Sequence, residues 1–151
     1  MTLEKIDGTD YENLINQRSL GAELTIIPTR RGDDKRVYRI ETASLPKLLQ
    51  HGGVSADFLD DPSSISWLDL RGTTEISLAA VIGLNVLSAA SWDAIKMGMA
   101  LWLDALPFSA RLELDVGVED ADGSRKWFRA RGRAEDVLAA LDRLRDESSE
   151  P

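Results

Sequence analysis

Three short segments of the sequence carry residue types that bind ions or take part in catalysis. The first, Asp69-Leu70-Arg71-Gly72-Thr73-Thr74-Glu75, lies between a predicted strand and a predicted helix. Backbone N–H groups at a helix N-terminus bind anions, so Arg71, Gly72, Thr73 and Thr74 form a candidate anion site. One glycine without a lysine falls short of a Walker A loop. Capping by Thr73 or Thr74 explains the same residues without a ligand.

The other two segments are an acidic turn and a lone histidine. Asp120-x-Asp122-x-Ser124 begins like a calcium-binding loop, but its glycine is residue 123 and no glutamate stands at the twelfth position. An Asp-Gly pair is also typical of a hairpin turn. His51 is the only histidine, and nothing in the sequence supplies a nucleophile or an orienting acid beside it. We therefore expect no catalytic residues, no metal and no cofactor.

Composition and charge limit the classes of partner. The net charge of −8 disfavours nucleic acid, because Lys and Arg supply that affinity by neutralising phosphates. There is no cysteine, so disulfides and thiolate metal sites are absent. The polar segment from Met1 to Asp10 does not look like a signal peptide, and we expect a cytoplasmic protein.

The hydrophobic pattern predicts two similar ββα units, related by a shift of 90 residues, at 22–50 and 112–140. In the first, Leu24, Ile26, Tyr38 and Ile40 would point inward from a hairpin. In the second, the inward set is larger, and Glu113 and Asp115 would face Arg129 and Arg131 across the strands. The inward residues of the second hairpin would be Leu112, Leu114, Val116, Val118, Phe128 and Ala130. Whether the repeat reflects duplication stays open.

Between these units we expect a strand at Ile65–Leu70 and a long apolar helix from Glu75 to about Leu106. Ile76 to Trp92 forms a run of 17 uncharged residues, which is short of the roughly 20 that span a bilayer. No stable membrane insertion is therefore expected. Ala90, Ala94 and Gly98 form a ridge of small residues on this helix, covered either by the chain itself or by a second protein or copy.

A second candidate interaction surface lies on the last predicted strand. Trp127, Arg129 and Arg131, with Arg133 beyond them, alternate onto its outer face. Tryptophan and arginine are typical of protein-interface hot spots. The alternative is that a helix of the same chain covers Trp127.

Residues 76–146 resemble the effector-associated constant components of bacterial conflict systems. The corresponding stretches are an Ala-rich segment, a Trp-Leu pair, two strands around an Asp-Gly turn and a final Leu-rich helix. The resemblance implies a non-enzymatic adaptor that accompanies an effector. The stretches are Ala79 to Leu87, Trp102-Leu103, Arg111 to Glu119, Asp122-Gly123, Arg125 to Arg131 and Ala134 to Arg145.

The sequence thus predicts a single α+β domain over 1–146 and a disordered tail at 147–151. About five mostly antiparallel strands would form two ββα units, with the long helix packed on one face. The expected function is a non-catalytic protein-protein interaction module, an adaptor in a bacterial defence system, which binds another protein or itself. Two alternatives stay open: an immunity-type protein that neutralises a basic toxin, and a small enzyme or anion-binding protein that uses Asp69–Glu75.

Overall fold

The fold is built on a mixed six-stranded sheet. A computed structural model describes residues 2–16, 20–31, 35–68, 75–83, 89–106, 110–120 and 122–149. The sheet has the order β1-β9-β8-β7-β2-β5 and is mixed, since β7 runs parallel to β8 and β2 runs parallel to β5. Its strands are β1 (Thr2–Ile6), β2 (Leu24–Ile27), β5 (Ala56–Phe58), β7 (Glu75–Ile82), β8 (Arg111–Glu119) and β9 (Arg125–Gly132).

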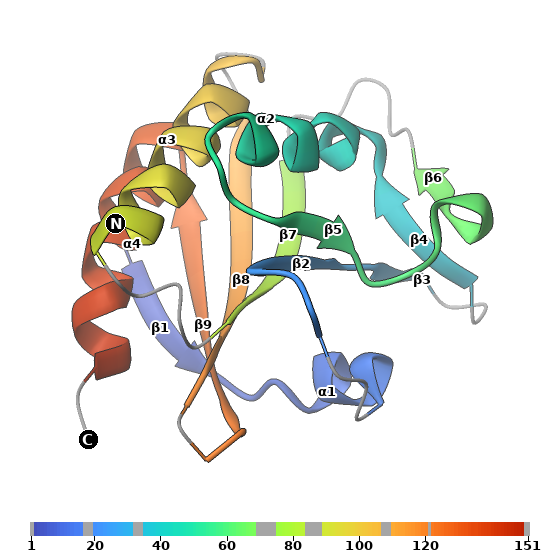
Figure 1. Ribbon diagram of the computed structural model, residues 1–151, viewed down its shortest axis with the longest axis horizontal. Coiled ribbons are helices and arrows are strands. Elements are labelled where there is room, and N and C mark those ends of the chain that lie inside the picture. Colours follow the sequence, from blue (N-terminus) through green and yellow to red (C-terminus); the bar gives the residue numbers. More distant parts are fainter. Residues whose placement is uncertain are drawn as a thin grey trace.

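A smaller sheet of three strands, in the order β3-β4-β6, extends from one side of the larger one (Figure 1). Pro28 separates β2 from β3, and because proline lacks an N–H group it interrupts the hydrogen-bond ladder there. The chain passes from one sheet to the other at this residue. The strands are β3 (Thr29–Arg31), β4 (Lys35–Arg39) and β6 (Ser66–Leu68).

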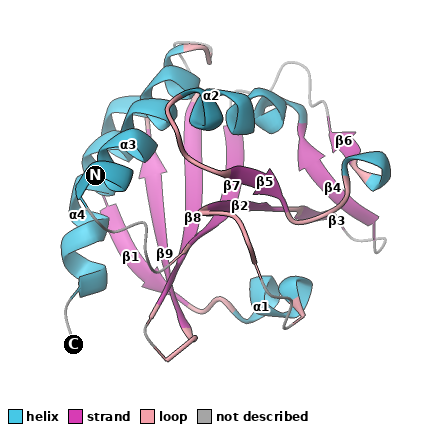
Figure 2. Cartoon of the chain, in the orientation of Figure 1, coloured by secondary structure: helices cyan, strands magenta, loops and turns pink. Residues whose placement is uncertain are grey.

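Helices lie on both faces of the large sheet but cover them unequally. Figure 2 shows α2, α3 and α4 layered over one face, with α1 near the other. Two 3-10 turns, Ile40–Ser44 and Pro62–Ser64, complete the described elements. The helices are α1 (Thr9–Ile15), α2 (Leu45–His51), α3 (Ala89–Asp104) and α4 (Ala134–Ser149). Among the described residues, none of these helices has both the length and the apolar character needed to cross a bilayer.

The main core fills the space between the sheet and the three-helix layer. Trp92, Ile95, Met99 and Trp102 of α3 point into it, and Val137 and Leu141 of α4 do so from the side. Burial of large apolar side chains supplies most of the stabilising free energy of such a core. The indole N–H of Trp102 donates a hydrogen bond of 2.8 Å to the carbonyl of Glu41, so this buried polar group is satisfied.

The predicted helix over Glu75–Leu106 is wrong in its first part. Glu75–Ile82 forms β7, a central strand paired with β8 on one side and β2 on the other. From Leu78 to Ile82 its side chains are buried on both faces of the sheet, so the alternation that marks a half-buried strand is confined to its first residues. An apolar run of this kind is compatible with either a helix or a strand. The helical part begins at Ala89, and the family resemblance therefore loses the helix expected from Ala79 onward.

Only one of the two predicted ββα units has the expected pairing. β8 and β9 form the antiparallel hairpin, and α4 follows it to Ser149, past residue 146, where the expected domain ends. In the first half, Leu24–Ile27 pairs with β7 and β5 rather than with Lys35–Arg39, because Pro28 diverts the chain. Leu24, Ile26 and Tyr38 are buried as expected, whereas Ile40 begins a 3-10 turn and is exposed.

Several other expectations correspond to described elements. The strand expected at Ile65–Leu70 is the shorter β6, and Asp122-Gly123 makes the turn between β8 and β9 with a positive φ of 86° at Gly123. The Asp122 carboxylate accepts hydrogen bonds from the backbone N–H and hydroxyl of Ser124. Those bonds lower the pKa of Asp122 and explain its place in the turn without a metal ion. No cluster of metal-ligating side chains occurs in the described ranges.

Candidate functional site

The most polar feature of the structure lies on the face of the large sheet opposite the three-helix layer. Side chains of a strand alternate between faces, so the residues between the buried Leu112, Leu114 and Val116 point the other way. On β8 these are Arg111, Glu113, Asp115 and Gly117. Their neighbours on the same face are Glu75, Ser77, Ala79 and Val81 of β7 and Trp127, Arg129 and Arg131 of β9.

Helix α1 covers one end of this polar face. Leu14 and Ile15 of α1 pack with Ala79, Val81 and Trp127 in a second, smaller core cluster. Tyr11 stacks on the indole of Trp127, with ring centroids 4.8 Å apart and planes inclined by 20°. Glu12 forms an ion pair with Arg125 at the start of β9. The helix is therefore anchored to β9 by an aromatic contact and a charge pair.

Two glycines make room for Trp127 beneath this helix. Gly117 is the register partner of Trp127 on β8, and a Cβ atom there would lie 2.7 Å from the indole. A Cβ atom on Gly8, just before α1, would lie 2.0 Å from Cδ1 of the same ring. The indole thus lies between two stretches of bare backbone, and the side chain is 3% exposed.

At the edge of the covered region, Asp115 forms the centre of a polar network. Arg129 donates two hydrogen bonds to its carboxylate, from Nε to Oδ1 at 2.7 Å and from Nη2 to Oδ2 at 2.9 Å. The Tyr11 hydroxyl donates a third, to Oδ2. The Asp115 side chain is 3% exposed, and this two-pronged pairing with arginine is the geometry that best compensates a buried carboxylate.

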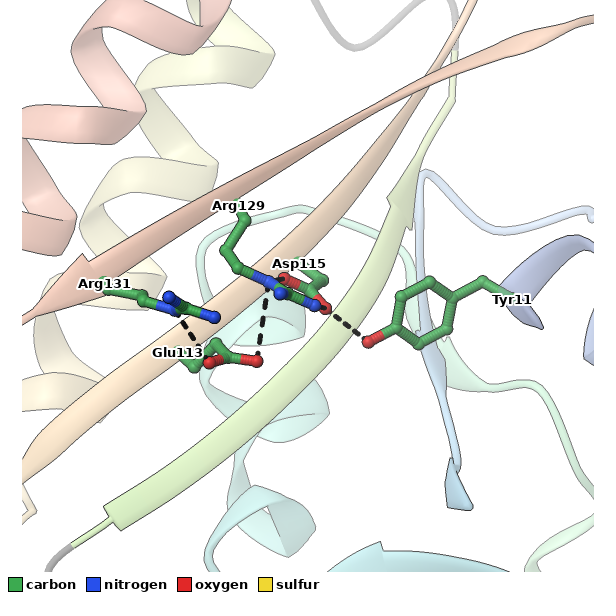
Figure 3. A network of polar contacts seen from close by, with 5 residues as sticks. All are labelled: Tyr11, Glu113, Asp115, Arg129 and Arg131. Carbon is green, nitrogen blue, oxygen red and sulfur yellow. Dashed lines mark hydrogen bonds and ion pairs between the residues drawn. The ribbon is translucent and has the colours of Figure 1, made fainter. Parts of the chain in front are cut away.

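The network continues toward solvent through Glu113. Arg131 donates a 2.9 Å hydrogen bond from Nε to Oε2 of Glu113, and Nε of Arg129 lies 3.5 Å from its Oε1. Figure 3 shows the five side chains in a row, from Arg131 through Glu113, Arg129 and Asp115 to Tyr11. Exposure falls along that row, from 54% at Arg131 to 3% at Asp115.

The protonation states of Tyr11 and Arg129 are fixed at neutral pH. Burial raises the pKa of Tyr11 far above its usual value of 10.0, and the hydrogen bond to Asp115 raises it further. The hydrogen bonds to Asp115 likewise raise the pKa of Arg129. Tyr11 therefore stays neutral and Arg129 stays charged. Neither residue is poised to exchange a proton near pH 7.

Two hollows lie over the exposed part of this face. One of about 360 Å³ is lined by Glu75, Ser77, Arg111, Glu113 and Arg131, among others. The second, of about 350 Å³, lies against α1. Both are lined by Ser77 and Glu113, so we treat them as one feature, the sheet-face groove. The second hollow is lined by Asp7, Asp10, Tyr11, Leu14, Pro28, Ser77, Leu78, Ala79, Glu113, Asp115 and Arg129.

The predicted surface of Trp127, Arg129 and Arg131 is therefore divided. All three side chains share a face, as expected, but Trp127 is covered by Tyr11 and Gly8 and presents no exposed hot spot. Arg129 is engaged with Asp115, and Arg131 remains largely exposed at the groove. Arg133 lies past the end of β9, and its backbone N–H donates to Asp136 of α4.

The ridge of Ala90, Ala94 and Gly98 lies on α3 and is covered at Gly98 by the chain itself. A Cβ atom on Gly98 would lie 2.6 Å from Cδ2 of Leu49, so α2 approaches the bare backbone of α3 at this point. A Cβ atom on Gly52, which follows α2, would lie 3.9 Å from the Ala94 carbonyl. The small residues Ala94 and Gly98 thus make room for α2. The Ala90 side chain lies outside the described residues.

The candidate anion site at Arg71, Gly72, Thr73 and Thr74 lies outside the described residues. Glu75, the last residue of the segment Asp69–Glu75 that contains it, is the first residue of β7. Glu75–Ile82 is a strand and not the start of the expected helix, so the helix N-terminus on which the anion-site prediction rested is absent at Glu75. The contribution of the segment to the site is Glu75 itself, which lines the groove.

Sequence reasoning paired Glu113 and Asp115 with Arg129 and Arg131 but did not include Tyr11, Ser77 or Asp10 in a site. The hairpin pairing follows from local alternation, whereas Tyr11 reaches Asp115 only after α1 docks on the sheet.

The chain matches no protein-family model, no curated protein and no solved structure. The geometry of the groove is therefore the basis for assigning a function.

Proposed function

We propose that this chain is a non-catalytic protein-binding module, an adaptor, which receives a segment of a partner protein in the sheet-face groove. The observation that carries the proposal is the state of Asp115. Its carboxylate, the most deeply buried charge of the groove, already accepts three hydrogen bonds from Arg129 and Tyr11. A carboxylate whose two oxygens are engaged in this way holds Arg129 and Tyr11 in position at the groove wall, which is a structural role.

The remaining groove residues favour recognition of a charged polypeptide. Glu113 lies where the two hollows meet, is 37% exposed, and is fixed in position by Arg129 and Arg131. Arg111 and Glu75 add one charge of each sign nearby. Fixed charges of both signs select a partner by charge complementarity and reject partners with like charges in the same positions.

The proposal retains the adaptor role implied by the resemblance to conflict-system components. The strand, Asp-Gly turn, strand and Leu-rich helix of that resemblance correspond to β8, β9 and α4. These elements also form one wall of the groove and the layer behind it. A cytoplasmic location, in which such an adaptor would meet an effector, belongs to the same proposal.

Neutralisation of a basic toxin is a second candidate function, favoured by charge. The net charge is −8, and the hollow beside α1 is lined by four acidic residues and a single arginine. Asp7 and Asp10 of this set are exposed. A basic partner would approach this end of the groove faster than a neutral one, because complementary potentials accelerate association.

Obstruction of the groove tests the proposal. Ser77 is exposed and lines both hollows, so Ser77→Tyr fills the groove without altering the core. Ser66→Tyr is the matched control, because Ser66 is an exposed strand residue of the other sheet. Each tagged variant is used to capture partners from the native host, and the stoichiometric partner is identified by mass spectrometry and then purified for titration.

We expect wild type and Ser66→Tyr to hold the same partner and Ser77→Tyr to lose it. An effector as partner supports the adaptor, and a toxin whose activity the chain inhibits supports the immunity role. Retention of the partner by Ser77→Tyr, or recovery of every bait alone, would contradict binding through the groove.

A further inference from the structure

A second surface of the chain lies on α3, on the side of the large sheet opposite the groove. Trp92, Ile95 and Met99 point from α3 into the core, which leaves the positions between them facing outward. Of those outward positions, Met97 is 66% exposed and Leu101 is 51% exposed. The two lie one helical turn apart and form a short apolar ridge along the outside of the helix.

Acidic residues bound the ridge at both ends. Asp93 precedes Met97 by one turn, Asp104 follows Leu101 by one turn, and both are exposed. We name Asp93, Met97, Leu101 and Asp104 the α3 ridge. From the rise of an α-helix, its two carboxylates lie on the order of 16 Å apart along the axis.

The basic groups near the ridge do not neutralise it. Lys96 is the one base of α3, and its Nζ lies 2.7 Å from Asp142 of α4 and 3.8 Å from Asp93. One lysine therefore serves two carboxylates. At the other end, Arg133 and Glu135 line a hollow beside Asp104 and bring one charge of each sign. Of these charged residues, Asp93, Asp104, Glu135 and Asp142 outnumber Lys96 and Arg133.

From this arrangement we propose that the α3 ridge docks an amphipathic helix of a partner protein, with basic residues on both sides of its apolar contact. An apolar pair at i and i+4 is the pattern by which one helix packs along another. Lysine or arginine residues about eleven positions apart on the partner would reach Asp93 and Asp104 together. The basic residues set the register of the partner helix along α3, and Met97 and Leu101 supply the apolar contact.

Charge also excludes a second copy of this chain as the occupant. A two-fold dimer through the ridge places each surface against itself, so an antiparallel pair of α3 helices brings Asp93 of one copy to Asp104 of the other. Like charges then meet at both ends, in a protein whose net charge is already −8.

The location of the ridge gives the chain two docking surfaces that face in opposite directions. The groove lies on the side of the sheet that α1 partly covers, and α3 lies on the other (Figure 1). An adaptor with surfaces placed in this way holds two partners at once without steric overlap.

A designed peptide tests the ridge directly. The probe is a helical peptide with leucines at i and i+4, bounded by lysines eleven positions apart, and its matched control carries glutamates in place of the lysines. Binding to the intact chain is measured by fluorescence anisotropy at two salt concentrations. We expect the lysine peptide to bind at least about tenfold more tightly than the glutamate peptide, and less tightly at high salt.

Variants separate the two parts of the ridge. Met97→Ser with Leu101→Ser should abolish binding, and Asp93→Asn with Asp104→Asn should weaken it about tenfold. Glu4→Gln with Asp57→Asn is the control, because it removes the same charge from exposed positions elsewhere. Equal affinity for the two peptides, no binding of the lysine peptide, or a concentration-dependent dimer that Met97→Ser with Leu101→Ser abolishes would each overturn the proposal. Ser77→Tyr should leave peptide binding unchanged, which distinguishes this surface from the groove.

Discussion

The guanidinium of Arg129 pairs side-on with the buried carboxylate of Asp115, through Nε at 2.7 Å and Nη2 at 2.9 Å. Asp115 is 3% exposed and Arg129 is 26% exposed, so the pair lies at the boundary between the α1-covered core and the groove. Removal of the arginine leaves a buried charge that only Tyr11 compensates.

We therefore expect Arg129→Ala to lower the free energy of unfolding by about 3 kcal/mol, because a buried ion pair that loses one partner retains the desolvation cost of the other. Arg131→Ala is the matched control. Its pair with Glu113 is largely exposed, and its loss should cost less than about 1 kcal/mol. Urea denaturation of both variants, with unchanged m-values, measures the difference. Equal losses for the two arginines would show that Asp115 is not buried as described.

Tyr11 makes stability depend on pH in the alkaline range. Burial holds the pKa of Tyr11 in the folded chain above its usual value of 10.0, so the folded state retains a proton that the unfolded chain releases. The stability that Tyr11 contributes to the folded state is complete below pH 10, and it decreases as the pH rises above that value toward the raised pKa. We expect the unfolding free energy of wild type to fall more steeply above pH 10 than that of Tyr11→Phe.

Chemical denaturation at a series of alkaline pH values measures these slopes. At neutral pH the Tyr11→Phe variant should already be less stable by about 1 kcal/mol, since Asp115 loses one of its three hydrogen bonds. Parallel pH profiles for the two proteins would contradict the buried hydrogen bond between Tyr11 and Asp115.

The cover that α1 places on Trp127 depends on the absence of a side chain at Gly8. A Cβ atom there would lie 2.0 Å from the indole, so Gly8→Ala should displace α1 and cost about 3 kcal/mol. The released Trp127 should become accessible to acrylamide quenching. Gly21→Ala is the control, because a Cβ atom at Gly21 meets nothing within 4 Å. Quenching in Gly8→Ala equal to that of the control would show that Trp127 is not held beneath α1.

Local patterns predicted the hairpin of β8 and β9, because its contacts join residues close in sequence. Alternation alone placed Glu113 opposite Arg131 and Asp115 opposite Arg129, and the register confirms both pairs. Alternation also assigned Trp127 to the outer face correctly, and the alternative that a helix of the same chain covers it is confirmed by α1. Which helix does so could not be predicted, because Tyr11 lies more than a hundred residues away in the chain.

The first half of the chain departed further from prediction for two physical reasons. Leu78–Ile82 is buried on both faces, because the main core lies on one side of β7 and the α1 cluster on the other, so its periodicity does not identify it as a strand. Pro28 sits inside what the alternation presented as one strand, and it divides the segment between two sheets. The groove then forms from β7, which the sequence assigned to a helix.

The extent of the α1 cover along β7 gives the last prediction. Ser77 and Val81 point to the same face of the sheet, but Ser77 lies in the groove and Val81 is 1% exposed beneath α1. Val81→Asn buries an amide without partners and leaves a packing defect, so it should cost about 3 kcal/mol or more. Ser77→Asn should change the unfolding free energy by less than about 0.5 kcal/mol, because both side chains remain in solvent. Thermal and urea unfolding of these two variants tests both the strand assignment of β7 and its cover by α1. If Glu75–Ile82 were a helix, as the sequence predicted, Ser77 and Val81 would lie on the same face one turn apart. The two substitutions would then lower the unfolding free energy by similar amounts.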